Sequence, residues 1–289
     1  MNSEQYSHHS ARLSGHPFQK MNGLGNDFVI LDLRHGNASM TGEAARLIAD
    51  RKTGIGCDQV ITLEDRGKPF MGIWNADGSE VDACGNAARC IGWILMEELG
   101  IDATNFATNA TLHHVKRAGN MRVSVDMGEP KLNWKKIPLS EQMDDTRFID
   151  VKLGPIDAPV LWGPSAVNMG NPHCVFFVDD VEAQALDRFG PLVENHPMFP
   201  ERANVSVAQV ISEFRIRVRV WERGAGITKA CGTAACAVLV SANRRRLTGR
   251  KATIILDGGE LAVEWDQNNH VIMTGPIEHE FDGELPVID

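Results

Sequence analysis

The chain has 289 residues, which is enough to bury a large core and close to the size at which single cores divide into two domains. Hydrophobic residues make up 43% and charged residues 23%, a composition typical of globular proteins that excludes a disordered chain. The net charge of −9 and a single short basic run, Arg244 to Arg246, argue against nucleic acid as a partner. No window reaches the ~18 consecutive apolar residues that a membrane helix needs.

Residues 1–17 are polar and contain no apolar segment of the kind found in signal peptides. We predict that they form a flexible tail. Its two histidines, His8 and His9, are not expected to bind metal, because no further His or Cys lies close by. In a chain without a secretory leader the six cysteines are expected to be reduced, which predicts a cytoplasmic location.

Apolar runs with β-branched residues predict the strands of the first half, which we expect over residues 28–33, 59–63 and 70–74. Thr41 is a suitable N-cap for a short helix that runs to Asp50. The glycines at 23 and 25 invite comparison with a dinucleotide-binding loop. That motif needs a strand before the glycines and a third glycine where Phe28 stands, so we reject it.

A short motif occurs twice, about half the chain apart. Residues 83–90 read ACGNAARC and residues 230–236 read ACGTAAC. After Cys84 the apolar residues keep helical spacing until Gly100. After Cys231 an almost wholly apolar run predicts a buried helix that ends at three arginines. Each of these two cysteines is therefore expected at the N-terminus of a buried helix.

Two further cysteines are expected to be structural. Cys57 precedes a strand, where a small buried apolar residue is the simplest interpretation. Cys90 lies inside the first of the two buried helices and is expected to pack there. A metal site formed by Cys84 and Cys90 is rejected, because their spacing without an intervening histidine fits no common zinc pattern.

The second half repeats the order of strands, glycine-bearing turn and cysteine motif. A strand over 121–127 precedes a stretch from 130 to 164 that is rich in proline and glycine, and we place the domain boundary there. Further strands are expected at 175–178, within 201–210, at 214–223 and as hairpins over 251–274. His173 follows a Gly-Asn-Pro loop, so a structural and a functional role both remain open for it.

Strict alternation over 214–223 predicts that Phe214, Ile216, Val218 and Val220 face the core while the intervening arginines face solvent. From the recurring order of elements we predict an α+β fold of two pseudo-symmetric domains, each a curved, barrel-like β-sheet around a central helix. The domains are expected at 18–130 and 131–276, with the active site in the cleft between them.

A cysteine at a helix N-terminus lies beside unpaired N–H groups, which lower its pKa toward neutrality and also bind carboxylates. Two such cysteines around one substrate form an acid/base pair. One thiolate removes a proton from the carbon beside a carboxylate, while the other thiol donates a proton from the opposite face. The result is inversion of a stereocentre, and this chemistry requires no cofactor and no metal.

From Met21 to the C-terminus the chain resembles the diaminopimelate epimerases, enzymes that interconvert LL- and meso-diaminopimelate without a cofactor. The resemblance rests on short motifs that occur in the family's order: GLGNDF (23–28), GIGCDQ (54–59), NADGSE (75–80), ACGNAARC (83–90), MGNPH (169–173), ERAN (201–204), ERGAG (222–226) and ACGT (230–233). It implies an isomerase of lysine and peptidoglycan-precursor biosynthesis that forms homodimers. It also implies that the C-terminal segment, 277–289, returns to the first domain as a strand.

By position in these motifs, the resemblance implies that Cys84 and Cys231 are the acid/base thiols. The backbone at the two helix starts would bind the carboxylate of the reacting centre through Gly85, Asn86, Gly232 and Thr233. The rest of the pocket would consist of Asn26, Gln59, Asn75, Asn171, Asn204, Glu222 and Arg223. Arg223 would pair with the distal carboxylate, a task that suits a planar guanidinium. His173 and Glu222 would lie near the thiols and tune them.

Three positions depart from the family's usual pattern. Ile227 stands where an acidic residue is common, and Ala87 and Ala234 stand where glycine is common. Alanine is the better helix former, so these two changes are expected to cost little. Ile227 removes a charge near the second cysteine motif, which bears on the tuning of the site and not on the reaction.

Two other interpretations remain open. A proline racemase or hydroxyproline epimerase uses the same cysteine pair, but its ring substrate has no distal carboxylate to match Asn75, Asn204 and Arg223. A thiol redox or metal-binding protein built on Cys84 and Cys231 belongs to a different class. Bound metal, or function that survives the loss of Arg223, would identify it. A disulfide between the two thiols would be a liability of the site and not its function.

Overall fold

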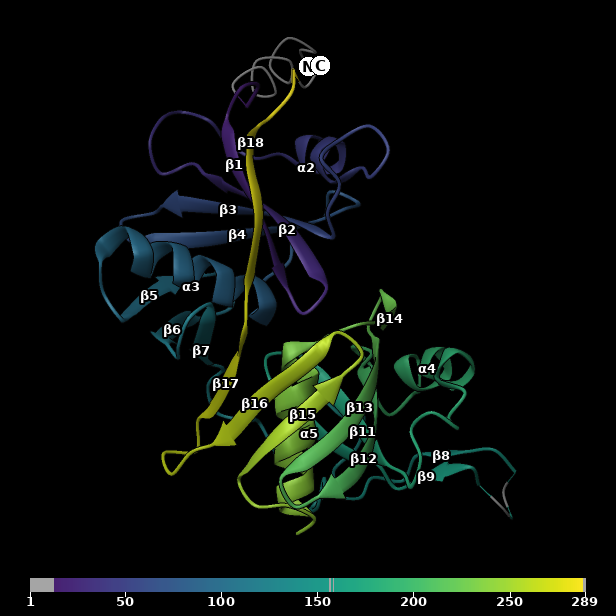
Figure 1. Ribbon diagram of the computed structural model, residues 1–289. Coiled ribbons are helices and arrows are strands. Elements are labelled where there is room, and N and C mark those ends of the chain that lie inside the picture. The colour runs from purple at the N-terminus through teal and green to yellow at the C-terminus, as the bar shows by residue number, and fades with distance from the viewer. Residues whose placement is uncertain (1–12, 156, 158, 288–289) are drawn as a thin grey trace. The chain divides into compact units, whose positions relative to one another are not determined.

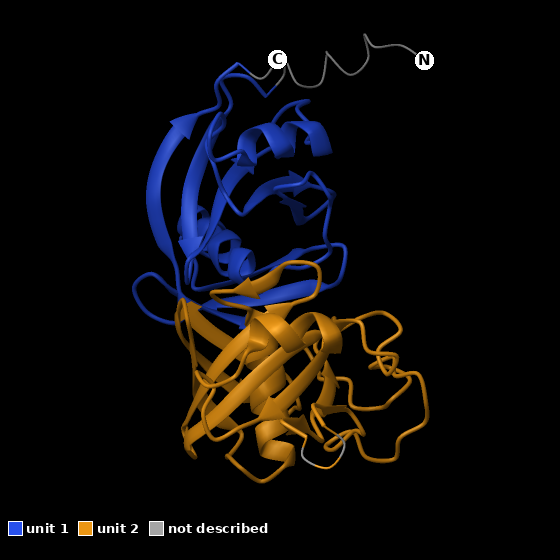
Figure 2. Cartoon of the chain, turned by 90° about the vertical axis from the view of Figure 1, so that its right-hand side faces the viewer, with its two compact units in different colours: residues 1–125, 276–289 blue, residues 126–275 orange. Residues whose placement is uncertain are grey.

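The computed structural model describes residues 13–155, 157 and 159–287, which form two compact units (Figures 1 and 2). Unit 1 contains the chain up to Val125 together with the segment from Pro276 onward, and unit 2 is Asp126–Gly275. The sequence placed the first boundary at 130, five residues later. Residues 127 and 128 belong to unit 2 because their backbone groups exchange hydrogen bonds with Val271, at 2.8 and 2.9 Å.

Unit 1 is a mixed sheet with two helices. In spatial order its strands are β7 (Arg122–Asp126), β6 (Leu112–Arg117), β5 (Ala103–Ala107), β4 (Pro69–Asn75), β3 (Gln59–Asp65), β2 (Asn26–Asp32), β1 (Pro17–Gly23) and β18 (Glu278–Glu284). The helices are α2 (Gly42–Ala49) and α3 (Gly85–Leu99). β18 pairs antiparallel with β1, so the C-terminal segment does return to the first unit.

Unit 2 has the same kind of architecture. Its strands follow the spatial order β10 (Ser165–Asn168), β11 (Pro172–Phe177), β12 (Asn204–Ser212), β13 (Arg215–Glu222), β15 (Lys251–Leu256), β16 (Gly259–Trp265) and β17 (Val271–Pro276). The short β14 (Gly226–Thr228) pairs with β13, and β8 (Lys152–Leu153) pairs with β9 (Leu161–Trp162) in a separate ribbon. The helices are α4 (Leu186–Glu194) and α5 (Gly232–Arg244).

The two units are copies of one design. Along each chain segment, successive strands pair antiparallel, parallel, antiparallel, parallel, antiparallel and antiparallel, from β1 to β7 and from β10 to β17. The register of the first parallel pair also agrees. Phe28 of β2 pairs with Gln59 of β3, and the corresponding pair in unit 2 is His173 of β11 with Asn204 of β12. The α+β fold of two pseudo-symmetric halves is therefore confirmed, and residues of one half have identifiable equivalents in the other.

Each sheet curves around its second helix. In unit 2, α5 contacts β10, β11, β12, β13, β15 and β16 (Figure 1), and in unit 1, α3 contacts β1, β5 and β6. The first helix of each unit, α2 or α4, covers the face of the sheet that points away from the second helix. Val29 and Leu31 of β2 pack toward α2, while Phe28 and Ile30 alternate onto the other face and are also buried.

Two further sequence expectations are corrected. Leu13 is fully buried and Gly15 N–H donates to Leu285 O, so residues 13–17 pack into unit 1 and do not belong to the predicted tail. Residues 1–12, with His8 and His9, lie outside the described residues. Phe214 is 62% exposed because it precedes β13, and the alternation that governs Ile216, Val218 and Val220 holds only inside the strand. β1, β5 and β6 were not predicted, since polar residues interrupt their apolar patterns.

Candidate active site

Both cysteines of the repeated motif are N-cap residues of the two enclosed helices, as their spacing predicted. Cys84 has extended backbone before α3, and its Sγ accepts a hydrogen bond of 3.5 Å from Ala87 N–H. α3 ends at Gly100, whose left-handed φ of 64° closes the helix. Cys231 has the same extended backbone before α5. Each thiol therefore stands where the free N–H groups of a helix start can bind an anion.

In unit 1 the predicted polar residues form two hydrogen-bonded groups, one of which lies at the start of α3. Cys84 Sγ donates to Asn26 Oδ1 over 3.8 Å, and Asn86 Nδ2 donates to the same oxygen over 3.3 Å. Gln59 Nε2 donates to Asn75 Oδ1 at 2.9 Å across the β3–β4 pair. Gln59 Oε1 is buried and accepts no hydrogen bond within the described part of the chain. An unpaired buried acceptor of this kind is uncommon in folded proteins.

Asp58, which the sequence did not single out, orients Asn26. Its Oδ2 accepts a hydrogen bond of 2.9 Å from Asn26 Nδ2, which leaves Asn26 Oδ1 directed at Cys84. Arg51 holds Asp58 in turn, with 2.8 Å between Nη2 and Oδ1. The Asp58 carboxylate thus determines that the amide oxygen of Asn26, and not its nitrogen, faces the Cys84 thiol.

In unit 2 the equivalent polar residues are mostly bound to one another. Asn204 is buried, its Nδ2 donating to Pro172 O and its Oδ1 accepting from Arg223 N–H, both at 3.0 Å. Its amide therefore braces the site on both sides. His173, fully buried inside β11, contacts Asn171 Oδ1 through Nε2 at 2.8 Å. Arg223 directs one guanidinium nitrogen to Glu201 O at 2.8 Å and is otherwise exposed.

The thiol of Cys231 is held in the neutral state. Burial raises its pKa well above the ordinary value, and the adjacent Glu222 carboxylate raises it further, while a hydrogen bond with Thr233 Oγ1 at 3.4 Å acts in the opposite direction. The expectation that the helix start lowers the pKa of this thiol is wrong for Cys231, because desolvation of a 5%-exposed group outweighs the helix N-terminus. In this state Cys231 is suited to donate a proton.

Burial also sets the charge of the groups around the second thiol. It raises the pKa of the Glu222 carboxyl, against hydrogen bonds from Thr228 and Cys231 that lower it. It lowers the pKa of His173 to about 3, with a smaller contribution from the Arg223 guanidinium. His173 is therefore neutral at physiological pH and serves as a hydrogen-bonding support for Asn171.

The remaining cysteines carry no sign of reactivity. Cys57 and Cys90 are buried, and burial raises their thiol pKa values to about 11 and about 12. Within the described residues no cysteine forms a disulfide, and no group of His, Cys, Asp or Glu side chains is arranged to hold a metal ion. No helix in the described ranges is long and apolar enough to span a membrane.

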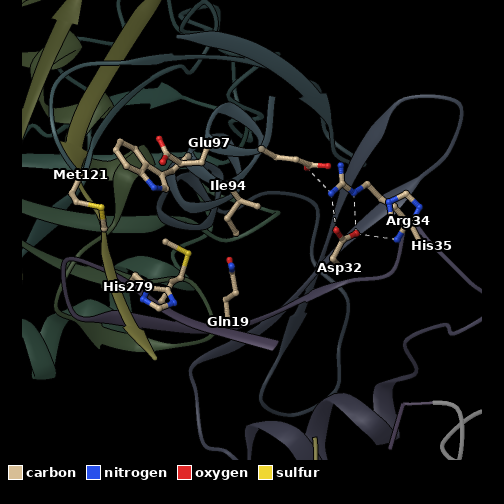
Figure 3. Close-up of a pocket in the computed structure, with 11 residues that line it drawn as sticks. Gln19, Asp32, Arg34, His35, Ile94, Glu97, Met121 and His279 are labelled. Carbon is tan, nitrogen blue, oxygen red and sulfur yellow. Dashed lines mark hydrogen bonds and ion pairs between the residues drawn. The ribbon is translucent and has the colours of Figure 1, made fainter. Parts of the chain in front are cut away.

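A cavity of about 490 Å³ lies elsewhere on unit 1 (Figure 3). Figure 3 shows Ile94 and Glu97 of α3 beside Met121 and His279, with the Arg34–Asp32 ion pair at the other end. None of the residues predicted for the active site lines it. Its α3 residues begin at Trp93, which is about 14 Å along the helix axis from the cysteine end.

Comparison with known proteins identifies one family. A family model described as diaminopimelate epimerase matches residues 18–133 and 165–280, segments that begin in β1 and at β10, the first strands of the two repeats. The chain is 54% identical over 274 residues to the diaminopimelate epimerase of Phenylobacterium zucineum, covering 94% of this chain and 98% of that one. The chain belongs to the diaminopimelate epimerase family. A second epimerase of the family, from a Methylobacterium species, is 51% identical over 285 residues, covering 95% of this chain and 96% of that one.

Solved structures place the fold in a wider group. A probable proline racemase from Agrobacterium radiobacter superposes with a TM-score of 0.65 at 14% identity, covering 94% of this chain and 93% of that one. At this identity the likeness concerns the fold alone. The identity with named diaminopimelate epimerases extends over nearly the whole chain, so the racemase interpretation is not favoured.

Proposed function

We propose that this protein interconverts LL- and meso-diaminopimelate in the cytoplasm, as a step of lysine and peptidoglycan-precursor biosynthesis, with Cys84 and Cys231 as the acid/base pair. The observation that carries the proposal is the duplication, which sets one cysteine at the start of an enclosed helix in each unit of a diaminopimelate epimerase family member. One thiolate accepts the α-proton and the other thiol donates its proton to the opposite face, so the α-carbon inverts while the two sulfurs exchange protonation states.

The backbone of both helix starts supports binding of the α-carboxylate. Gly85 and Asn86 follow Cys84, and Gly232 and Thr233 follow Cys231, so the backbone N–H groups of a helix start flank both thiols. These groups also stabilise the negative charge that develops when the α-proton leaves. Cofactor-free chemistry is consistent with this arrangement, because a developing carbanion beside a carboxylate gains its stabilisation from N–H donors.

The polar side chains support selection of a substrate with two amino-acid ends. Arg223 offers a largely free guanidinium for a distal carboxylate, and Gln59 Oε1 offers an unpaired acceptor for an ammonium group. A shorter substrate would leave such groups unpaired, which costs binding energy. A proline-like ring fills neither contact.

Two further properties are proposed for this chain. The first is assembly into a homodimer, which the family resemblance implies and light scattering at micromolar concentration would test. The second is an exclusive small-molecule role, with neither nucleic acid nor membrane as a partner. The net charge of −9 supports it, since an acidic protein is repelled by phosphate backbones and anionic lipid surfaces.

The experiment is a substrate comparison with reduced protein. LL-diaminopimelate, L-proline and trans-4-hydroxy-L-proline are each incubated with the wild type and with Arg223→Ala, and the stereoisomers are separated by chiral chromatography. We expect the wild type to form meso-diaminopimelate and to convert neither proline nor hydroxyproline, and we expect Arg223→Ala to lose about 100-fold or more in kcat/KM for LL-diaminopimelate. Conversion of proline or hydroxyproline without diaminopimelate would assign the protein to the racemases, and conversion of none would refute the proposal.

A further inference from the structure

A buried carboxylate outside the predicted site holds the segment that carries Glu222 and Arg223. Glu194, the last residue of α4, has a side chain that is 7% exposed. Its Oε2 accepts from Trp221 Nε1 at 2.7 Å, and its Oε1 accepts from Gly224 N–H at 2.9 Å. These two donors lie directly before and directly after the Glu222–Arg223 pair. The carboxylate therefore clamps both ends of that pair.

A third donor connects this carboxylate to the loop before β12. Arg202 Nη1 lies 3.1 Å from Glu194 Oε1, and the backbone of Ala203 donates to the Glu194 carbonyl at 3.2 Å. Asn204, the next residue, accepts from Arg223 N–H at 3.0 Å. Arg223 is thus fixed on two sides, by its own N–H on Asn204 and by the clamp around Glu194.

Unit 1 provides an internal comparison. Its equivalent of Trp221 is Trp74, since Trp74 pairs with Glu80 as Trp221 pairs with Ile227. Its equivalent of Glu194 is Ala49, the last residue of α2. Ala49 precedes Gln59 of β3 by the same number of residues as Glu194 precedes Asn204, the equivalent of Gln59 in β12. The indole N–H of Trp74 is buried without a hydrogen-bond partner in the described part of the chain.

The repeat fold therefore forms without this carboxylate, and unit 1 makes the same turn, with Gly78 N–H donating to Asn75 O as Ala225 N–H donates to Glu222 O. A negative charge at the C-terminal end of a helix is also electrostatically unfavourable. Glu194 is therefore explained neither by the fold nor by the stability of α4. The difference between the units lies in what the turn carries, which is Asn75 and Ala76 in unit 1 but Glu222 and Arg223 in unit 2.

We infer that Glu194 is a positioning residue for substrate specificity: it fixes the backbone on both sides of Glu222 and Arg223, so that the Arg223 guanidinium is presented to the distal carboxylate of the substrate. The inference rests on the proposed function. Glu194 acts through the turn and contacts no reacting atom. Its loss weakens binding of the distal end and leaves the proton transfers at the α-carbon largely intact.

The test compares Glu194→Gln, Trp221→Phe and the matched control Trp74→Phe. Glutamine keeps the shape of the side chain but can accept hydrogen bonds only through its single oxygen, so at least one clamp donor loses its acceptor. We expect KM for LL-diaminopimelate to rise about tenfold or more in Glu194→Gln and about threefold in Trp221→Phe, with kcat changed less than about threefold. Trp74→Phe should leave both constants unchanged. A fall in kcat with KM unchanged, in either Glu194→Gln or Trp221→Phe, would overturn the inference.

A second measurement separates this inference from the proposed function. Amide hydrogen exchange of the peptide containing Gly224 reports the clamp directly, without substrate. We expect exchange about tenfold faster than in the wild type in Glu194→Ala, which removes both acceptor oxygens, and no change in Trp74→Phe. Wild-type protein inactive on diaminopimelate would refute the proposed function. The amide hydrogen exchange of Gly224 would then still test whether Glu194 holds the turn. Unchanged protection of Gly224 would overturn the clamp whatever the reaction.

Discussion

Replacement of Gly92 by alanine should destabilise the protein, although alanine is the better residue in the middle of a helix. Gly92 lies inside α3, where a glycine-to-alanine change ordinarily stabilises by about 1 kcal/mol. At this position an added Cβ would lie 2.8 Å from Val115 Cγ2 and 3.0 Å from Val115 Cβ. Because Val115 is buried in β6, helix and strand must separate.

Overpacking of this kind costs about 1–3 kcal/mol, which exceeds the gain in helix propensity and leaves a net loss of about 1 kcal/mol. For a chain of this size that corresponds to a thermal midpoint lower by roughly 2–4 °C. Activity should fall as well, because the start of α3 carries Cys84. Gly249→Ala is the matched control, since a Cβ there would meet no atom within 4 Å.

The assay is a double-mutant cycle of Gly92→Ala and Val115→Ala, followed by calorimetry. Val115→Ala alone should cost about 2 kcal/mol. It removes the Cγ atoms that an alanine at position 92 would strike, so the double variant should be about 1 kcal/mol more stable than the sum of the single losses implies. A Gly92→Ala protein that melts above the wild type, or a cycle with no coupling, would refute the close approach of α3 and β6.

Three further outcomes are expected. Glu222→Gln removes a carboxylate that raises the pKa of Cys231, so alkylation of Cys231 by iodoacetamide at pH 8 should become faster, although burial keeps this pKa above its ordinary value. An unchanged alkylation rate would contradict the effect of Glu222 on the thiol. Burial raises the pKa of the Cys90 thiol from its ordinary 9.0 to about 12 in the folded protein. The contribution of this thiol to the free energy of unfolding is therefore present below pH 9 and is lost as the pH rises toward 12. Between pH 9 and 10 the stability of Cys90→Ala should therefore decline by about 1 kcal/mol less than that of the wild type in urea unfolding, and parallel declines would contradict the shift. Asp58→Ala frees the Asn26 amide to turn and should reduce kcat about tenfold, and kinetics equal to those of the wild type would show that Asp58 does not orient it.

The sequence was most informative where local signals act alone. The N-cap at Thr41, the left-handed Gly100 and the helical spacing after Cys84 each depend on residues within a few positions, and all were predicted. The two-fold repeat of the cysteine motif was enough to predict the duplicated architecture. Family motifs then pointed to Asn26, which the structure places beside Cys84, and to Glu222, which it places beside Cys231.

Features that depend on distant contacts were not predictable from the sequence. The raised pKa of Cys231 comes from its burial and from Glu222 on another element, which outweigh the local effect of the helix start. Glu194 is far from the motifs, and its role is visible only when Trp221 and Gly224 are seen to converge on it. Alignment of the two halves, which sets Ala49 against Glu194, is the sequence signal that would have drawn attention to it.

In the proposed mechanism both thiols act on one α-carbon. The most direct test is to incubate reduced protein with LL-diaminopimelate in heavy water and to follow α-deuterium incorporation together with formation of the meso isomer, for the wild type, Cys84→Ala, Cys231→Ala and the control Cys57→Ala. We expect deuterium in the meso product of the wild type and Cys57→Ala, and loss of isomerisation in each of the other two variants. Isomerisation that persists in either Cys84→Ala or Cys231→Ala would contradict it.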